Sequence, residues 1–151
     1  DSFEIARKMG LSYSFGIANL TSAHPNSVVL EVKGKSGRTL EVQACSLGGG
    51  RIMINRLDGL DVNCSCEIPT LIVHNLDQPG HVAEVTSMLA HKSVNIANMS
   101  LYRDKRGGSA VMVVEMDQPL PKESLEWLEH LEGIVKVTYI NVTEGEEDDV
   151  L

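Results

Sequence analysis

The sequence predicts an α+β protein in which a β-rich unit precedes a βαββαβ unit. Two observations predict this arrangement. In residues 1–68, short apolar runs alternate with clusters of Gly, Pro, Asn and Asp, which is typical of consecutive strands and turns. In residues 69–142, the spacing of the apolar residues changes repeatedly between about 2 and about 3.6, which is typical of strands that alternate with helices.

The length of 151 residues fits one domain of ordinary size or two small ones. No apolar run approaches the roughly 20 residues that cross a bilayer, so we expect no membrane partner. The first residues include neither an initiating Met nor a signal pattern. We therefore expect an internal fragment of a longer chain, without a visible targeting signal.

The β-rich unit is expected to begin with the end of a helix at residues 3–10. Apolar alternation then predicts short strands at residues 12–20, 27–33, 39–45, 51–56 and 61–67. Turn-forming triplets lie between them, including HPN at 24–26 and GGG at 48–50. Pro69 marks the end of the unit, because the connection there is too short to act as a free linker.

The second unit is expected to hold six elements in the order βαββαβ. The strands are expected at residues 70–75, 94–103, 109–116 and 134–142, and the helices at 81–91 and 119–131. Gly133 is a candidate C-cap of the second helix. Two helices on one face of a four-stranded antiparallel sheet form a ferredoxin-like sandwich. Apolar strand residues such as Val111 and Val113 predict that another copy or another domain covers the other face or an edge.

The net charge of −8 lies mostly in residues 144–151, which hold five of the 21 acidic residues. An acidic, aromatic-poor end of this kind is typical of a solvated, disordered tail. The 13 Lys and Arg residues gather on no predicted face, so we do not expect a nucleic-acid partner.

The three cysteines, Cys45, Cys64 and Cys66, have no spacing of a disulfide framework, which favours a reducing cytoplasm. Cys64 and Cys66 lie on one face of a predicted strand, and only Cys45 could add a third ligand for a metal or cluster. The five histidines also lack metal-ligand spacing. We therefore interpret the cysteines as buried structural residues and expect no metal site.

Two motifs of the first unit allow two interpretations each. In His24-Pro25-Asn26, the proline fixes a turn and presents an imidazole beside an amide, which suits binding of a carboxylate or transfer of a proton. The alternative is a plain turn. The glycines at 48–50 form either a bent connection or a place where the backbone closely approaches a ligand or a partner.

The segment Asp77-Gln78-Pro79-Gly80 lies between a strand and the start of a helix. Free N–H groups and the helix dipole favour an anion there, such as the carboxylate of an amino acid, and Asp77 could bind the ammonium group of the same molecule. Alternatively, Asp77 only caps the helix and Pro79 begins it.

The segment LIVHNLDQPGHVAEV and the later VNIANM resemble an ACT domain, whose signature is an Asp-x-Pro-Gly loop after the first strand and an Asn-Ile-like second strand. HPNSV and SLGGGRIMINRLDG resemble the latter part of the β chain of iron-sulfur L-serine dehydratase. The resemblance divides the chain into three parts: the C-terminal part of an allosteric substrate-binding domain at 1–68, an ACT domain at 69–143 and an acidic disordered tail at 144–151.

This resemblance implies a subunit of L-serine ammonia-lyase (EC 4.3.1.17), a cytoplasmic enzyme of amino-acid metabolism and gluconeogenesis that converts L-serine to pyruvate and ammonia. A partner α chain would carry the catalytic 4Fe-4S cluster. The cysteines of this chain do not match the cluster ligands, and the serine-rich segment with which the family's β chains begin is missing here. The fragment alone is therefore expected to be inactive.

The resemblance also implies two sites. His24 and Asn26 are expected near the substrate or the interface with the α chain. The ACT domain is expected to bind L-serine, a related amino acid or a monovalent cation such as K⁺, often at a homodimer interface. The residues carried over for this effector site are Asn75, Asp77, Gln78, Pro79, Gly80 and His81, with Asn95 and Ile96 as the opposing wall.

Two other functions remain open. The C-terminal regulatory region of D-3-phosphoglycerate dehydrogenase joins the same two modules in some members and uses them for feedback inhibition by serine. A free ACT amino-acid sensor that binds another protein is a third hypothesis. A nucleotide-binding dehydrogenase domain upstream would favour the first alternative, whereas a short segment with the serine-rich motif would favour the dehydratase.

Overall fold

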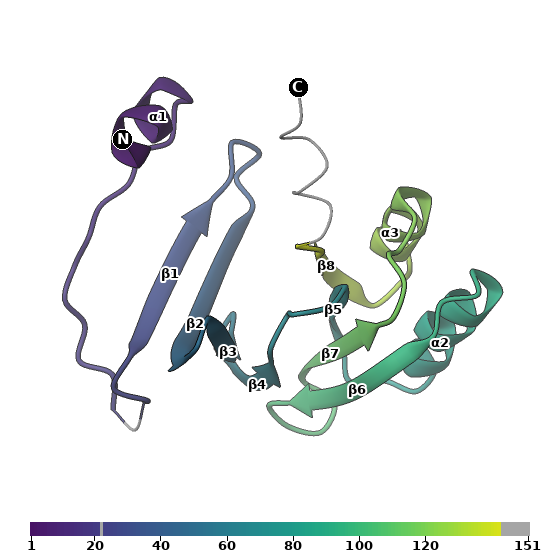
Figure 1. The fold of residues 1–151 in the computed structure, drawn as a ribbon. Coiled ribbons are helices and arrows are strands. Elements are labelled where there is room, and N and C mark those ends of the chain that lie inside the picture. Colours follow the sequence, from purple (N-terminus) through teal and green to yellow (C-terminus); the bar gives the residue numbers. More distant parts are fainter. Residues whose placement is uncertain (22, 143–151) are drawn as a thin grey trace.

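The computed structural model describes residues 1–21 and 23–142. The tail at 144–151, which we expect to be disordered, lies outside the described residues. The described part contains three helices and two four-stranded antiparallel sheets (Figure 1). None of its helices is long and apolar enough to cross a membrane.

The first sheet is a meander with the strand order β1-β2-β3-β4. Its strands are β1 (Ser27–Lys33), β2 (Thr39–Gly48), β3 (Arg51–Leu57) and β4 (Leu60–Cys64). Each pairs antiparallel with the next, and β-bulges interrupt the register of β2 with β3 and of β3 with β4. The predicted strands at 27–33 and 51–56 are close to those observed, whereas the last one ends at Cys64 and not at residue 67.

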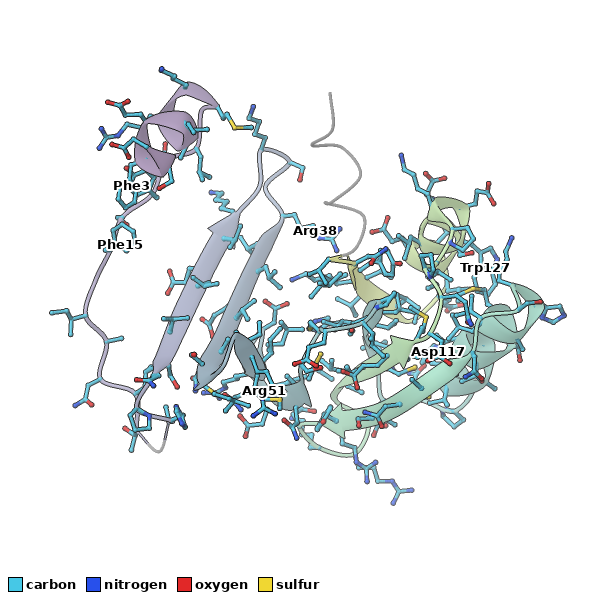
Figure 2. All side chains as sticks on the ribbon, in the orientation of Figure 1. Phe3, Phe15, Arg38, Arg51, Asp117 and Trp127 are labelled. Carbon is cyan, nitrogen blue, oxygen red and sulfur yellow. The ribbon has the colours of Figure 1, made fainter. Side chains whose placement is uncertain are left out.

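The segment before β1 differs from the prediction. A helix, α1 (Ser2–Lys8), is present, but residues 12–20 form no strand. The aromatic rings of Phe3, Tyr13 and Phe15 pack against one another, and α1 buries no residue. In Figures 1 and 2 this segment lies on the far side of β1 from the second sheet, beside the free edge of the first sheet, and it does not pair with that edge.

The second sheet has the strand order β6-β7-β5-β8. The elements are β5 (Thr70–Leu76), α2 (His81–His91), β6 (Ile96–Arg103), β7 (Ser109–Met116), α3 (Lys122–Glu129) and β8 (Ile134–Ile140). This sequence confirms the predicted βαββαβ order. The second helix is shorter than predicted, and Gly133 is not its C-cap, because α3 ends at Glu129 with His130 as the C-cap.

Helices α2 and α3 cover one face of the second sheet (Figure 1). Buried side chains from both layers form the core between them, and Leu71, Val73, Val85, Leu89 and Leu128 are completely inaccessible to solvent. The helical spacing of Val85, Met88 and Leu89 places all three on the face of α2 that meets the sheet.

The other face of the second sheet packs against the first sheet of the same chain. Ile72, Val111 and Val113 form a second buried cluster with side chains from β3, β4 and the segment after it, including Leu57 and Cys64. The sequence predicted that another copy or another domain would cover this face. The β-rich unit provides that cover, so the two sheets share a core.

Candidate functional site

The loop between β5 and α2 contains most of the predicted effector residues. Gly80 is the N-cap of α2, with a φ of 110°, and no side chain caps the first turn of the helix. The interpretation of Asp77 as a helix cap is therefore wrong. Gln78, Pro79 and Gly80 are exposed, so the backbone N–H groups at the start of α2 lack a side-chain partner and lie beside solvent.

Asp77 binds the hairpin loop between β6 and β7. Its Oδ2 atom accepts hydrogen bonds from the backbone N–H of Gly107 at 2.9 Å and from Nη1 of Arg103 at 3.0 Å. The Gly107 N–H and the Arg103 guanidinium lower the pKa of this carboxyl group below its ordinary value. The carboxylate is thus charged and held in place, and a ligand ammonium would share it with Arg103.

Asn75 and His81 lie under this loop, and both are buried. The Asn75 side-chain amide donates to the carbonyl of Leu76 at 2.7 Å, and His81 Nδ1 is 3.3 Å from Oε2 of Glu84. The other polar atoms of the two side chains, Asn75 Oδ1 and His81 Nε2, have no protein partner. Asn75 Oδ1 is thus a free acceptor beside the loop, whereas His81 Nε2 lies against Gly133, the residue before β8.

Asn95 and Ile96 do not lie near this loop within one chain. Ile96 pairs with Met116 at one end of β7, whereas Arg103 pairs with Ala110 at the other end. Eight residues of strand separate Asn95 from Arg103, which corresponds to about 25 Å. The Nδ2 atom of Asn95 donates to Oδ2 of Asp117 at 2.6 Å, and Figure 2 shows the position of Asp117. One chain therefore presents the two walls of the predicted site at opposite ends of its sheet.

His24 and Asn26 form an exposed turn before β1. The Asn26 N–H donates to Nδ1 of His24 at 3.2 Å, and the Ser27 hydroxyl donates to the His24 carbonyl at 2.7 Å. The Ser46 N–H donates to the Asn26 carbonyl, which connects this turn to the end of β2. The glycine triplet at 48–50 follows directly, and all three of its glycines have positive φ. The structure thus brings two predicted motifs to one end of the first sheet.

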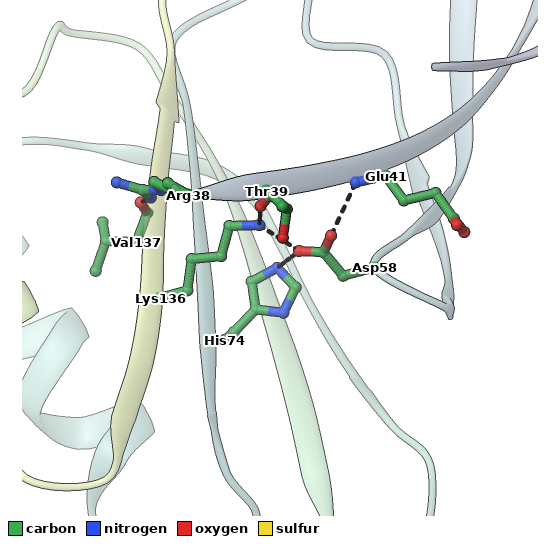
Figure 3. A network of polar contacts seen from close by, with 7 residues as sticks. All are labelled: Arg38, Thr39, Glu41, Asp58, His74, Lys136 and Val137. Carbon is green, nitrogen blue, oxygen red and sulfur yellow. Dashed lines mark hydrogen bonds and ion pairs between the residues drawn. The ribbon is translucent and has the colours of Figure 1, made fainter. Parts of the chain in front are cut away.

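The sequence did not reveal a polar network between the two sheets, which we call the inter-sheet clasp: Arg38, Asp58, His74 and Lys136 (Figure 3). Asp58 Oδ2 accepts from Nζ of Lys136 at 2.5 Å and lies 3.5 Å from Nε2 of His74. Nζ of Lys136 also donates to the Thr39 carbonyl, and the Arg38 guanidinium donates to the Val137 carbonyl. The clasp connects the β1–β2 and β3–β4 turns to β5 and β8.

Burial and charge shift the pKa values in the clasp. Burial lowers the pKa of His74 by disfavouring the imidazolium, although the neighbouring Asp58 partly opposes this shift. Burial alone would raise the pKa of Asp58, but hydrogen bonds from Lys136 and from the Glu41 N–H lower it overall. Asp58 is therefore ionised and His74 neutral near pH 7.

A cavity of about 380 Å³ lies beside the clasp. Its polar lining includes Asp58, His74, Asn75, Asp104 and Ser109. Asn75, the predicted effector residue that lies on β5 just before the loop, therefore also lines an inter-sheet cavity. Any rearrangement of the loop that moves Asn75 would reach the boundary between the two sheets.

Comparison with known proteins shows that residues 69–132 match the family model of the ACT domain. Over 92% of the chain, the sequence is 32% identical to the probable L-serine dehydratase β chain of Bacillus subtilis (strain 168), covering 63% of that protein. It is 29% identical to the L-serine dehydratase β chain of Peptoniphilus asaccharolyticus, over 93% of the chain and 64% of the relative. The chain thus spans just under two thirds of the length of these relatives.

A D-3-phosphoglycerate dehydrogenase of Bacillus subtilis (strain 168) is 25% identical over 91% of the chain, but the match covers only 26% of that protein. The predicted resemblance to L-serine dehydratase β chains and to the ACT domain is confirmed. The alternative family also contains a related region.

Proposed function

We propose, from the premise that residues 69–132 are an ACT domain, that this chain is a regulatory β chain, or part of one, of an L-serine dehydratase. The observation that carries the proposal is the similarity to two such β chains over more than 90% of the chain, across both sheets. The reaction would be that of L-serine ammonia-lyase, from L-serine to pyruvate and ammonia, in the cytoplasm.

In this proposal the catalytic 4Fe-4S cluster belongs to a partner α chain, where it would act as a Lewis acid on the serine hydroxyl. The described part of this chain does not fit such a cluster. Its three cysteines are buried, and among them only Cys64 and Cys66 are in contact. Cluster ligation needs about four thiolates that converge on one site. The chain alone would therefore be inactive, and its own residues would bind an effector and the α chain.

We propose that the effector site is the loop between β5 and α2. The carboxylate of L-serine or a related amino acid would accept from the N–H groups at the uncapped start of α2, at Gly80 and His81. Its ammonium group would bind Asp77, which is held by Arg103 and Gly107. A monovalent cation such as K⁺ is the other candidate, with Asn75 Oδ1 as a buried oxygen that has no protein partner.

A second copy of the chain would complete this site. β6 is an edge strand of the second sheet. If two β6 strands pair antiparallel, the start of each lies beside the end of the other. Asn95 and Ile96 of one copy would then approach the Asp77 loop of the partner. This pairing would bring together two walls that lie at opposite ends of the sheet within one chain. We therefore propose a homodimer formed through the ACT domains.

The inter-sheet clasp and the shared core would transmit effector binding to the first sheet, because the effector loop and the clasp meet at Asn75 and His74. The turn at His24 and Asn26, together with the glycines at 48–50, would contact the α chain. Both turns are exposed and lie at the same end of the first sheet.

The test is to purify the full-length chain anaerobically from its own cells, with whatever accompanies it, and to measure pyruvate release from L-serine. We expect pyruvate and a co-purifying, oxygen-sensitive α chain. A chain with neither a partner nor pyruvate formation would overturn the proposal.

The same preparation distinguishes the two alternatives. Oxidation of 3-phosphoglycerate with a nicotinamide cofactor would support a D-3-phosphoglycerate dehydrogenase, which the 25% identity over 91% of the chain keeps as the second candidate. Amino-acid-dependent oligomerisation without either activity would support a free ACT sensor. Calorimetry with L-serine and with KCl then identifies the effector.

A further inference from the structure

Cys64 and Cys66 form a close pair of thiols where the chain leaves the first sheet. Their Sγ atoms are 2.9 Å apart, and the structure shows both cysteines as free thiols. A disulfide joins two sulfur atoms at about 2.05 Å, so bond formation needs an approach of only about 0.9 Å. The pair belongs neither to the effector loop nor to the inter-sheet clasp, and the proposed function does not use it.

The backbone brings these sulfur atoms together. Two cysteines separated by one residue in a regular strand have Cα atoms about 6.7 Å apart, near the upper limit that a disulfide can span. Here β4 ends at Cys64, and Cys66 adopts a left-handed conformation with a φ of 54°. This conformation is unfavourable for a residue with a Cβ atom. The bend replaces the extended geometry and places the second thiol beside the first.

The two thiols are not equivalent. A hydrogen bond from the Cys66 S–H lowers the pKa of Cys64, whereas the same bond and burial raise the pKa of Cys66. Cys64 is therefore the more acidic and more reactive thiol of the two. Both side chains are buried, but Ser65 between them is half-buried and Glu67 is exposed. The pair thus lies directly beneath a surface segment that a small oxidant can approach.

We propose that Cys64 and Cys66 are a redox-active dithiol that a peroxide converts to an intramolecular disulfide. The Cys64 thiolate attacks one peroxide oxygen, the O–O bond breaks, and the departing hydroxide takes a proton to become water. The Cys66 sulfur then attacks the resulting sulfenic acid, the S–O bond breaks, and a second water leaves with the Cys66 proton. The two thiols lose two electrons in total, which reduce the peroxide to two waters.

The disulfide would alter the boundary between the two sheets. Both cysteines belong to the buried cluster that β3 and β4 form with Ile72, Val111 and Val113. The bond would fix the end of β4 to the crossover that leads to β5. Oxidation would thereby fix the local bend at residues 64–66, and a thiol reductant would reverse this effect.

Peptide mapping of the full chain tests this proposal, because trypsin separates the relevant cysteines. Residues 57–92 contain Cys64 and Cys66 without an internal Lys or Arg, and residues 39–51 contain Cys45. The reduced chain is treated with hydrogen peroxide under native conditions, and the remaining thiols are alkylated in denaturant. We expect peptide 57–92 to lose two hydrogen atoms, at least about tenfold faster than Cys45 is modified. Dithiothreitol should restore the original mass.

A matched set of variants completes the test. Cys45→Ser should keep the mass change, whereas Cys64→Ser and Cys66→Ser should each abolish it, with circular dichroism to confirm the fold. The wild-type map decides the question even if a serine variant fails to fold. A cross-link that includes Cys45, or a pair that stays reduced or reacts no faster than Cys45, overturns the proposal.

Discussion

The two sheets differ in how completely they are buried. The second sheet is covered by helices on one face and by the first sheet on the other, and Leu71, Val73 and Val111 are inaccessible to solvent. In the first sheet, side chains of β2, β3 and β4 pack against the second sheet, whereas β1 is largely exposed. Val28, Leu30 and Val32 of β1 lie on the face that carries Leu57 farther along the sheet, yet each is more than 50% exposed.

This difference in burial assigns different roles to the two sheets, because one is stabilised by its core and the other can change its conformation more easily. Apolar side chains contribute in proportion to the area that they remove from water, so the second sheet supplies most of the hydrophobic stabilisation. The outer strands of the first sheet have few contacts beyond their own hydrogen bonds, and such elements open at low free-energy cost. We expect the first sheet to be the part that adjusts to the proposed partner, while the second holds the proposed effector site rigid.

The largest expected effect comes from the same substitution made once in each sheet, which tests the difference in burial directly. Leu71→Ala, in the core between the second sheet and its helices, should lower the free energy of unfolding by about 2–5 kcal/mol through loss of buried area and formation of a cavity. Leu30→Ala on β1 makes the same chemical change at a position that is 52% exposed. Its effect should stay below about 1 kcal/mol. Urea unfolding measures both, and equal losses would contradict the comparison.

A smaller effect is expected where the effector loop meets β8. Gly133 has a φ of 82°, and a side chain at this position would collide with the His81 ring. Gly133→Ala should therefore cost about 1–3 kcal/mol of unfolding free energy. Gly37→Ala is the control, because Gly37 has a similar φ but open space around it. Recovery of part of the loss when His81→Ala is added would show that the collision, and not the backbone alone, causes the effect.

The order of elements in the second unit could be predicted from the sequence, because the spacing of the apolar residues alone distinguishes its strands from its helices. The same reasoning failed at residues 12–20, where alternation is present but the segment does not pair with the neighbouring edge strand β1. It also could not predict the partner of Asp77, because Arg103 and Gly107 reach this residue only when β5 and β7 pair. Local apolar patterns predict helices and strands, whereas contacts between side chains of different strands can be identified only once the sheet is assembled.

The inter-sheet clasp shows the same limit. Asp58 lies in the turn before Gly59, and Lys136 lies on β8, far from it in the sequence. Neither has a partner within its own segment. The ion pair between Asp58 and Lys136 exists because the two sheets pack together. In the folded chain both side chains are partly buried, which the sequence around each residue does not indicate.

The clasp predicts a pH dependence of the contact between the sheets. Because burial lowers the pKa of His74, protonation favours the unfolded chain, and stability should fall as the pH drops through about 6.5, the ordinary pKa of histidine. The lowered pKa of Asp58 adds stability above about 3.8, which is lost at more acidic pH. Asp58→Asn should cost about 1 kcal/mol at pH 7, which is usual for a partly exposed ion pair.

Unfolding experiments at several pH values measure this effect. In His74→Gln the decrease near pH 6.5 should be absent, while the acidic decrease due to Asp58 remains. Lys92→Gln, which removes an exposed pair with Glu123 on the far side of the helices, is the control. An unchanged pH profile in His74→Gln would assign the decrease to another group.

The smallest effect on stability is expected at Asp77, where the effect on ligand binding should be large. Its side chain is 19% exposed and connects two loops outside the hydrophobic core, so Asp77→Ala should lower the urea midpoint only slightly, as is usual for loss of a partly exposed ion pair. The same variant should weaken L-serine binding about tenfold, the usual loss for a charged hydrogen bond. Asp104→Ala is the control, because Asp104 is an acidic residue of the neighbouring hairpin whose carboxylate accepts from the adjacent Lys105 N–H. Calorimetry in which both variants bind equally would exclude Asp77 from the site. A selective loss would instead show that the rigid sheet positions a binding carboxylate without depending on it for stability.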